Sequence, residues 1–214
     1  MVFRIGMVKI HKIQGDITLE IAKTFSDSVA IDTEATGLQI PERDKLSLIQ
    51  ICGENGDVFI IQPDRTNYKA PNLVSVLENN SIQKIGHFLR FDKSGLEYFL
   101  KCKIKNIFDT KIASKIVRTY TDSHGLKNLV QEFCGKNLDK RQGSSDWNRS
   151  INDLSEKQLE YAANDVVFLH KIKSELEKML IREKRMDLYL RCINFLDTRI
   201  ELDQSGFKFD IFEH

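Results

Sequence analysis

The sequence predicts an α/β or α+β domain built on one mixed sheet that helices flank. Two observations predict this class. Short apolar runs bounded by turn residues, typical of buried strands, come first, and residues from Asp109 onward follow the i, i+3, i+4 spacing of helices. A length of 214 residues fits one domain with a sizeable core. We therefore expect a single domain over 1–214, with about 181–214 as a C-terminal helical extension and tail.

Strands are expected first at Val29–Asp32, Leu46–Cys52 and Val58–Ile61. The connection Glu54–Asp57 contains Asn-Gly, which tolerates the positive φ angles of a tight hairpin. The three runs therefore predict an antiparallel meander. A further buried strand is expected at Gln83–His87.

Helices alternate with and follow these strands. Pro71 suits the first turn of one helix, and Ser155 with Gln158 three residues later has the form of a capping box. The expected helices are Pro71–Asn79, Asp92–Lys101, Asp109–Thr119, Gly125–Cys134, Ser155 to about Leu180, and Met186–Leu202.

Composition narrows the class of protein. Lys and Arg total 32 against 31 for Asp and Glu, a balance that neither demands nor excludes a nucleic-acid partner. The four cysteines lie far apart without a Cys-x-x-Cys pair, which argues against a zinc site. No secretory signal and no stretch of membrane-spanning length is present, so we expect a cytoplasmic protein without a membrane partner, its cysteines buried as thiols.

A pair of carboxylates ends the first strand. Asp32 and Glu34 are two residues apart, so both project from the same face of the strand. Two carboxylates together at a buried strand end repel each other unless a cation lies between them. The alternative is an acidic turn that merely leaves the strand for solvent.

Two more acidic positions lie downstream. Asp92 follows the strand at Gln83–His87, where its alternative role is a helix N-cap. Tyr161 and Asp165 are four residues apart on the Ser155 helix and therefore share a face. For Asp165 the alternative is a residue favoured by the helix dipole.

Taken together, the four carboxylates have a chemical purpose. Two Mg²⁺ or Mn²⁺ ions need several oxygen ligands, and such a pair can activate water and clamp a scissile phosphate. We expect Asp32, Glu34, Asp92 and Asp165 to bind two divalent cations, and Tyr161 to orient or deprotonate the attacking water.

These stretches resemble the motifs of the DEDD 3′-5′ exonucleases, in the tyrosine-bearing branch that includes ribonuclease D. The resemblance covers roughly 29–176, in the family's order. It implies a ribonuclease H-like fold, a mixed sheet of five to six strands flanked by helices. The segments that carry it are Val29–Glu34, Lys84–Asp92 and Leu159–Asp165, with Leu46–Ile51, Phe108–Ala113 and Ser145–Trp147 between them.

The chain is more closely similar to the short, stand-alone nanoRNase C type of oligoribonuclease, through Arg118–Lys127, Gln142–Trp147 and the ending Gly206–His214. That resemblance implies hydrolysis of short single-stranded RNA, dinucleotides above all, to 5′-mononucleotides by a ring-shaped homo-octamer. One departure stands out. Asn usually follows the histidine of the second motif, and here that position is Phe88.

Several residues are candidates for substrate contact. Leu38 either wedges against a base or is a half-buried loop residue. His87 either contacts the sugar or phosphate of the substrate or is a core histidine. Trp147 either stacks on a base or anchors its loop. Arg90, Gln142 and Ser145 are candidate hydrogen-bond donors to a phosphate of the substrate. The full candidate set is Thr33, Leu38, His87, Arg90, Gln142, Ser145 and Trp147.

Three other functions fit the sequence. The chain could be a ribonuclease D-like trimmer of structured RNA, a DNA exonuclease, or a catalytically silent RNA-binding module. A silent relative would be expected to lose at least one of the five catalytic candidates, and this chain keeps them all. The aromatic tail, with Phe207, Phe209 and Phe212, either folds back on the core or docks on a neighbouring subunit. The resemblance favours the contact with a neighbouring subunit.

Overall fold

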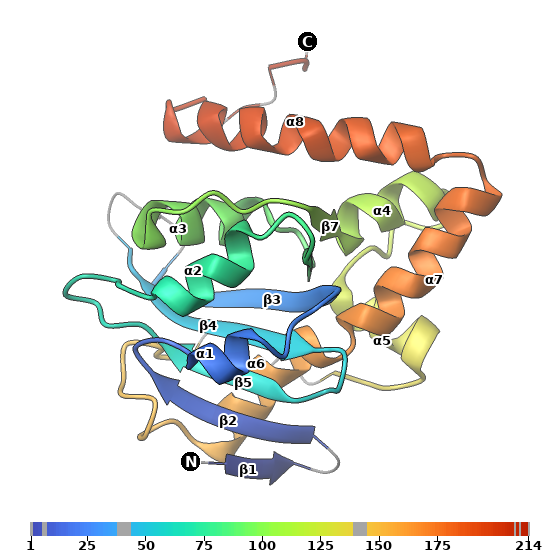
Figure 1. Cartoon of the computed structure of the whole chain (residues 1–214). Helices are drawn as coiled ribbons and strands as arrows, with labels where there is room; N and C mark the ends of the chain where they lie inside the picture. Colours follow the sequence, from blue (N-terminus) through green and yellow to red (C-terminus); the bar gives the residue numbers. More distant parts are fainter. Residues whose placement is uncertain are drawn as a thin grey trace.

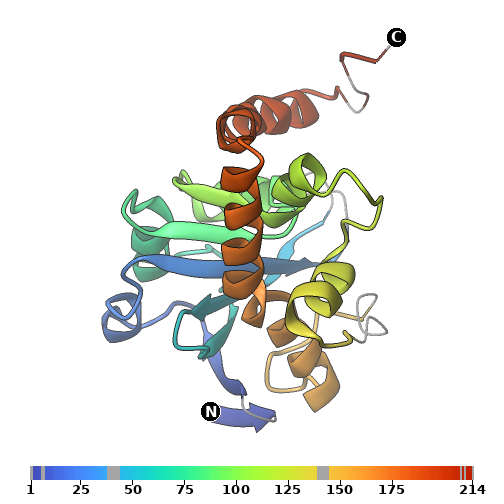
Figure 2. The ribbon, with the colours of Figure 1, turned by 90° about the vertical axis from the view of Figure 1, so that its right-hand side faces the viewer.

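A computed structural model describes residues 2–5, 8–37, 44–138, 145–207, 209 and 211–213, with only the backbone given for 2–5. It confirms the α/β class: a mixed sheet is flanked by helices on both faces (Figures 1 and 2). The described sheet has seven strands, one or two more than expected, in the order β1-β2-β5-β4-β3-β6-β7.

The centre of the sheet is the predicted meander. Strands β3 (Ser28–Ala35), β4 (Leu46–Gly53) and β5 (Val58–Gln62) pair antiparallel, and β6 (Gln83–Gly86) lies parallel to β3. All residues of β4 and β5 are buried, as expected for apolar runs inside a sheet covered on both faces. The carboxylate-bearing strand β3 is therefore held between two neighbours.

The additional strands lie at the two edges. β1 (Val2–Ile5) pairs with β2 (Val8–Gln14), which runs parallel to β5, and β7 (Ile107–Asp109) runs parallel to β6. Sequence reasoning missed them because Lys9, His11 and Lys12 interrupt the apolar residues of β2, while β1 and β7 are only four and three residues long.

The helices follow the expected order with three corrections. Helix α1 (Leu19–Ala22), four residues long, was not expected. Helix α3 begins at Arg90, two residues before the predicted start, and the single helix expected from Ser155 is divided into α6 and α7 at Phe168. The division lets α6 pack on β3, β4 and β5 while α7 packs on β6 and α4. The helices are α1 (Leu19–Ala22), α2 (Pro71–Glu78), α3 (Arg90–Leu100), α4 (Thr110–Val117), α5 (Leu126–Cys134), α6 (Glu156–Val167), α7 (Leu169–Arg182) and α8 (Met186–Gln204).

A hydrophobic core covers each face of the sheet. Ala30 and Leu48 face one core, which α4 to α7 complete, and Val29 and Ile49 face the other, which α2 and α3 complete. Figure 2 shows α1 and α2 on one side of the sheet and α5 on the other. Helix α8 spans the β7 edge: its Tyr189 packs in the first core, whereas Leu196 and Ile200 pack in the second.

The exposure of the cysteines agrees only in part with the expectation of buried thiols. Cys52 and Cys102 are buried thiols as expected, but Cys134 is only half-buried and Cys192 is exposed, at a cavity that α8 lines. Among the described helices, none combines the length and apolar character needed to cross a bilayer.

Candidate active site

Three carboxylates meet above the end of β3. Asp32 and Glu34 alternate with Thr33 along the strand and project from the face that α6 covers, while Asp165 projects from α6. One oxygen from each carboxylate lies within 4.8 Å of the others. Neighbouring carboxylates this close form the donor set that a hard divalent cation requires.

Asp92 reaches the same place from the opposite core. It is buried in the first turn of α3, and its Oδ1 accepts a 2.6 Å hydrogen bond from the Thr33 hydroxyl. The N-cap alternative is wrong, because the capping position is Leu89. Burial raises the pKa of the Asp92 carboxyl to about 6, although the hydrogen bond from Thr33 opposes the rise.

The clustered charges have a clear electrostatic signature. Burial, together with the nearby Asp165 and Asp92 carboxylates, raises the pKa of Glu34 to about 9. This cost disappears when a divalent cation supplies positive charge between the oxygens. The half-buried carboxylates of Asp32, Glu34 and Asp165 and the buried one of Asp92 offer oxygen ligands only, which fits Mg²⁺ or Mn²⁺ bound by the four.

Tyr161 completes the predicted set of five. The capping box of Ser155 and Gln158 begins α6 as predicted, and places Tyr161 one turn before Asp165. Burial raises the pKa of the Tyr161 hydroxyl far above its ordinary value, and the carboxylates of Asp165, Glu34 and Asp32 add to the shift. At neutral pH the hydroxyl keeps its proton, so it is a hydrogen-bond donor rather than a base.

All five residues line one cavity of about 650 Å³. This volume lies in the range of small-molecule sites. Among the described residues, the cavity lining comprises Asp32, Thr33, Glu34, Ala35, Thr36, Gly37, His87, Phe88, Phe91, Asp92, Leu126, Ser145, Trp147, Tyr161 and Asp165.

His87 is oriented at the cavity wall. Its Nδ1 lies 2.9 Å from the Thr110 hydroxyl, which donates to the Gly86 carbonyl at 3.0 Å. Because that hydroxyl has one proton, Nδ1–H is the donor and Nε2 is the acceptor in the neutral ring. The Nδ1 contact fits the core-histidine interpretation. The ring also lines the cavity, and the substrate-ligand interpretation stays a prediction.

The other substrate candidates divide. Thr33 and Ser145 line the cavity, and Leu38 and Gln142 lie outside the described residues. Trp147 also lines the cavity, but its side chain is 3% exposed and its ring lies 6.1 Å from that of Tyr161. With so little exposed ring surface, the anchor interpretation of Trp147 is favoured over base stacking.

Arg90 is the candidate that the fold directs elsewhere. Its Nε donates to Asp203 Oδ2 at 2.5 Å and its Nη2 binds the other oxygen of that carboxylate, so the guanidinium is engaged in a bidentate pair with α8. Arg90 lines a second cavity rather than the carboxylate cavity. This geometry therefore gives no support to Arg90 as a hydrogen-bond donor to a substrate phosphate.

Sequence reasoning missed residues that shape the cavity. Phe88 stands where the motif usually has Asn. It has a positive φ of 69°, is 44% exposed and lines the cavity. Asp109, the N-cap of α4, accepts hydrogen bonds from the backbone N–H groups of Phe88 and Leu89 at 3.2 and 2.7 Å. A signal was present, since Asp109 directly precedes a predicted helix and matches a preferred N-cap type.

Comparison with known proteins places this site in a family. A family profile described as 3′-5′ exonuclease matches residues 9–181. Ribonuclease D from Gluconacetobacter diazotrophicus is 32% identical over 162 residues, which are 74% of this chain and 39% of that protein. The chain spans less than half the length of the curated relatives named ribonuclease D or DNA polymerase I that it matches.

Solved structures extend the comparison to the whole chain. Brucella melitensis NrnC is 44% identical with a TM-score of 0.89, over 98% of this chain and 100% of that one. Escherichia coli ribonuclease D shares the fold, with 24% identity and a TM-score of 0.77. The match covers 89% of this chain and 50% of that protein's chain. The chain therefore belongs to the metal-dependent DEDD 3′-5′ exonucleases, in their ribonuclease D-like branch of the NrnC type.

Proposed function

We propose that this protein hydrolyses short single-stranded oligoribonucleotides from the 3′ end, with dinucleotides favoured, and releases 5′-mononucleotides. The observation that carries the proposal is the convergence of Asp32, Glu34, Asp92, Asp165 and Tyr161 on one cavity. Brucella melitensis NrnC, which this chain matches over its full length, has been solved bound to pGG and with bound Mg²⁺.

The mechanism assigns a role to each side chain. Asp32, Glu34, Asp92 and Asp165 would hold two divalent cations, which supply charge neutralisation at the phosphate and a more acidic water. Tyr161, protonated at neutral pH, donates a hydrogen bond that orients the attacking water. His87, held through Nδ1 by its contact with Thr110, lines the cavity and would contact the terminal sugar or phosphate of the substrate.

We also propose that the chain works as a homo-oligomer through its C-terminal face, defined here as α8 with the described tail residues. Large apolar side chains are exposed there together: Leu188, Leu190, Phe195, Phe207, Phe209, Ile211 and Phe212. Such a cluster is larger than isolated exposed apolar residues on a monomer. A second copy of this chain is the proposed occupant. The resemblance suggests an octameric ring, in the cytoplasm, built from chains that each form one domain with a C-terminal extension.

The test compares two labelled RNAs, a dinucleotide and an oligomer of roughly seven nucleotides, with Mg²⁺, with Mn²⁺ and with chelator. We expect rapid metal-dependent cleavage of the dinucleotide and much slower cleavage of the longer RNA. Equal rates on both would favour a ribonuclease D-like trimmer. Cleavage of the matching DNA dinucleotide alone would favour a DNA exonuclease, and no cleavage of any substrate would contradict the proposal.

A further inference from the structure

Helix α8 begins after the segment that matches the family profile, which ends at residue 181. It nevertheless lies against α3, the helix that carries Asp92 (Figure 1). Polar contacts join the two helices at three positions of α3, namely Arg90, Lys93 and Ser94. These positions flank Asp92 on both sides within one and a half turns of the helix.

The contact at Arg90 is a bidentate ion pair with Asp203, near the end of α8. Asp203 also accepts a 2.5 Å hydrogen bond from Arg199, which in turn donates to the carbonyl groups of Phe207 and Phe209. A bidentate pair restricts both the distance and the orientation of its partners. Asp203 therefore connects α3, α8 and the tail at one point.

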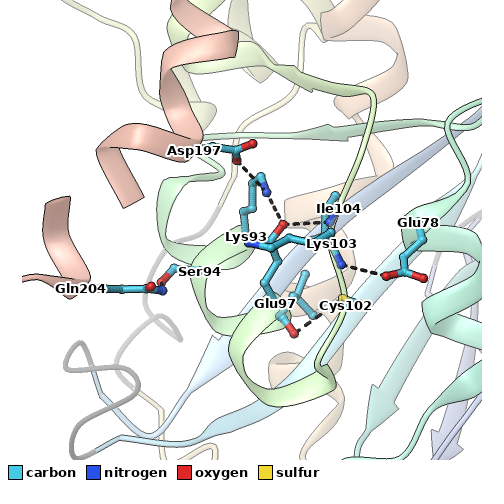
Figure 3. A network of polar contacts seen from close by, with 10 residues as sticks. Glu78, Lys93, Ser94, Glu97, Cys102, Lys103, Ile104, Asp197 and Gln204 are labelled. Carbon is cyan, nitrogen blue, oxygen red and sulfur yellow. Dashed lines mark hydrogen bonds and ion pairs between the residues drawn. The ribbon is translucent and has the colours of Figure 1, made fainter. Parts of the chain in front are cut away.

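The contact at Lys93 is the most buried of the three. The Lys93 side chain is 3% exposed, and its ammonium group pairs with Glu97 of α3 and with Asp197 of α8, the latter at 2.8 Å (Figure 3). Gln204 Nε2 donates to the Ser94 hydroxyl at 3.1 Å, also drawn in Figure 3. A buried ammonium keeps its charge only with such partners, so the spacing of α3 and α8 is closely determined here.

The start of α3 is held by α8 through β7. The buried Tyr189 hydroxyl of α8 accepts a 2.8 Å hydrogen bond from the Asp109 backbone N–H. The Asp109 carboxylate accepts from the N–H groups of Phe88 and Leu89, immediately before α3. Asp92 thus lies on a segment supported by α8 before it, beside it and after it.

We propose that α8 positions Asp92 for metal binding, with Asp203 as its main positioning residue. This inference rests on the proposed function insofar as Asp92 is taken as a cation ligand. Supporting residues behind a metal ligand matter because the ligand must be held close to its productive geometry. Asp92 is the carboxylate that reaches the cluster from the opposite core, so its place relative to the other three depends on how α3 is seated.

The test is the substitution Asp203→Asn, with Mn²⁺ affinity measured by calorimetry on the substrate-free protein. We expect binding to weaken by about tenfold. The Mn²⁺ concentration for half-maximal turnover should rise in parallel, while KM for the dinucleotide at saturating metal stays within about twofold. Asp203→Glu, which keeps the carboxylate, should recover most of the lost affinity.

The matched control is Asp187→Asn, which removes an exposed ion pair of α8 with Arg191 and should leave Mn²⁺ affinity unchanged. If Asp203→Asn fails to fold, Asp197→Asn removes the partner of Lys93 at a more exposed position and should weaken Mn²⁺ binding in the same direction. A lower Tm with unaltered Mn²⁺ affinity would overturn the inference and leave α8 a structural helix. Because calorimetry needs no turnover, its outcome stands apart from failure of the wild-type protein to cleave the dinucleotide.

Discussion

The carboxylate cavity and the second cavity share Phe88 in their linings and differ in the chemistry of their other lining residues. The carboxylate cavity gathers four acidic side chains around about 650 Å³, whereas the second cavity, about 450 Å³, lies under the C-terminal face and is lined mainly by apolar residues such as Ile112, Phe195 and Ile211. In the first, like charges are brought together at a cost in electrostatic free energy. In the second, apolar surface remains in water.

The difference teaches that different side chains of this fold serve chemistry and assembly. Each region carries an unfavourable term that binding would relieve: cations would neutralise the first, and an apolar partner would bury the second. The carboxylate cavity should therefore control chemistry with little effect on assembly. The exposed apolar side chains of the C-terminal face should control assembly, whereas the side of α8 that contacts α3 serves the seating of Asp92.

The strongest attempt to break this comparison is Asp32→Asn. We expect turnover of the dinucleotide to fall by at least about 1,000-fold, because a cation ligand is lost where charge must be stabilised. Tm of the metal-free protein should stay the same or rise, since one of the four mutually repelling carboxylates is removed. Turnover assays and thermal unfolding measure both, with the exposed Asp153→Asn as control. Unchanged turnover would refute the assignment of the site.

Tyr161→Phe is expected to have the next largest effect. The hydroxyl is protonated at neutral pH, so its loss removes a donor to the water but no charge. We expect kcat to fall roughly 10- to 100-fold with Mn²⁺ affinity retained. Steady-state kinetics together with calorimetry distinguish this result from a general disruption of the site, which would weaken metal binding as well.

The pH dependence sharpens the electrostatic half of the comparison. The pKa of Glu34 is about 9 in the folded protein, above that of the unfolded chain, so the folded state keeps a proton that the unfolded state loses. The free energy of unfolding of the metal-free protein should therefore fall as pH rises from about 4.5 towards 9. Glu34→Gln should flatten that trend in thermal unfolding.

Metal binding must displace the same proton. Mn²⁺ affinity of the wild-type protein should therefore rise with pH, by up to about tenfold per unit for each proton released. Calorimetry in buffers of different ionisation enthalpy counts these protons. An affinity that is independent of pH between about 6 and 8 would contradict the raised pKa of Glu34.

The smallest expected effect on the folded chain is that of Phe212→Ser. This side chain is 78% exposed and its ring lies 6.0 Å from that of Phe195, so its loss should change the stability of one chain by less than about 0.5 kcal/mol. Light scattering should nevertheless show a shift towards smaller assemblies. Leu19→Ser, an exposed apolar residue on α1, is the control. An unaltered assembly would argue against the tail as a subunit contact.

Much of the fold was determined by local sequence. The apolar runs of β3, β4 and β5, the Asn-Gly hairpin, Pro71 and the Ser155 capping box each carry their own signal, because strand burial, turn geometry and helix capping depend on neighbouring residues. The spacing of Asp32 with Glu34 and of Tyr161 with Asp165 likewise fixed which side chains share a face.

Only the tertiary structure decided how distant segments meet. That Asp92 joins the cluster from the other core, that Arg90 pairs with Asp203 instead of the cavity, and that Trp147 is buried beside Tyr161 all depend on packing between residues far apart in the chain. A side chain's partner across such distances follows from the seating of whole elements, which no local pattern encodes. The strands missed by sequence reasoning, β1, β2 and β7, are a further example, since pairing to a neighbour rather than a strong local preference makes them strands.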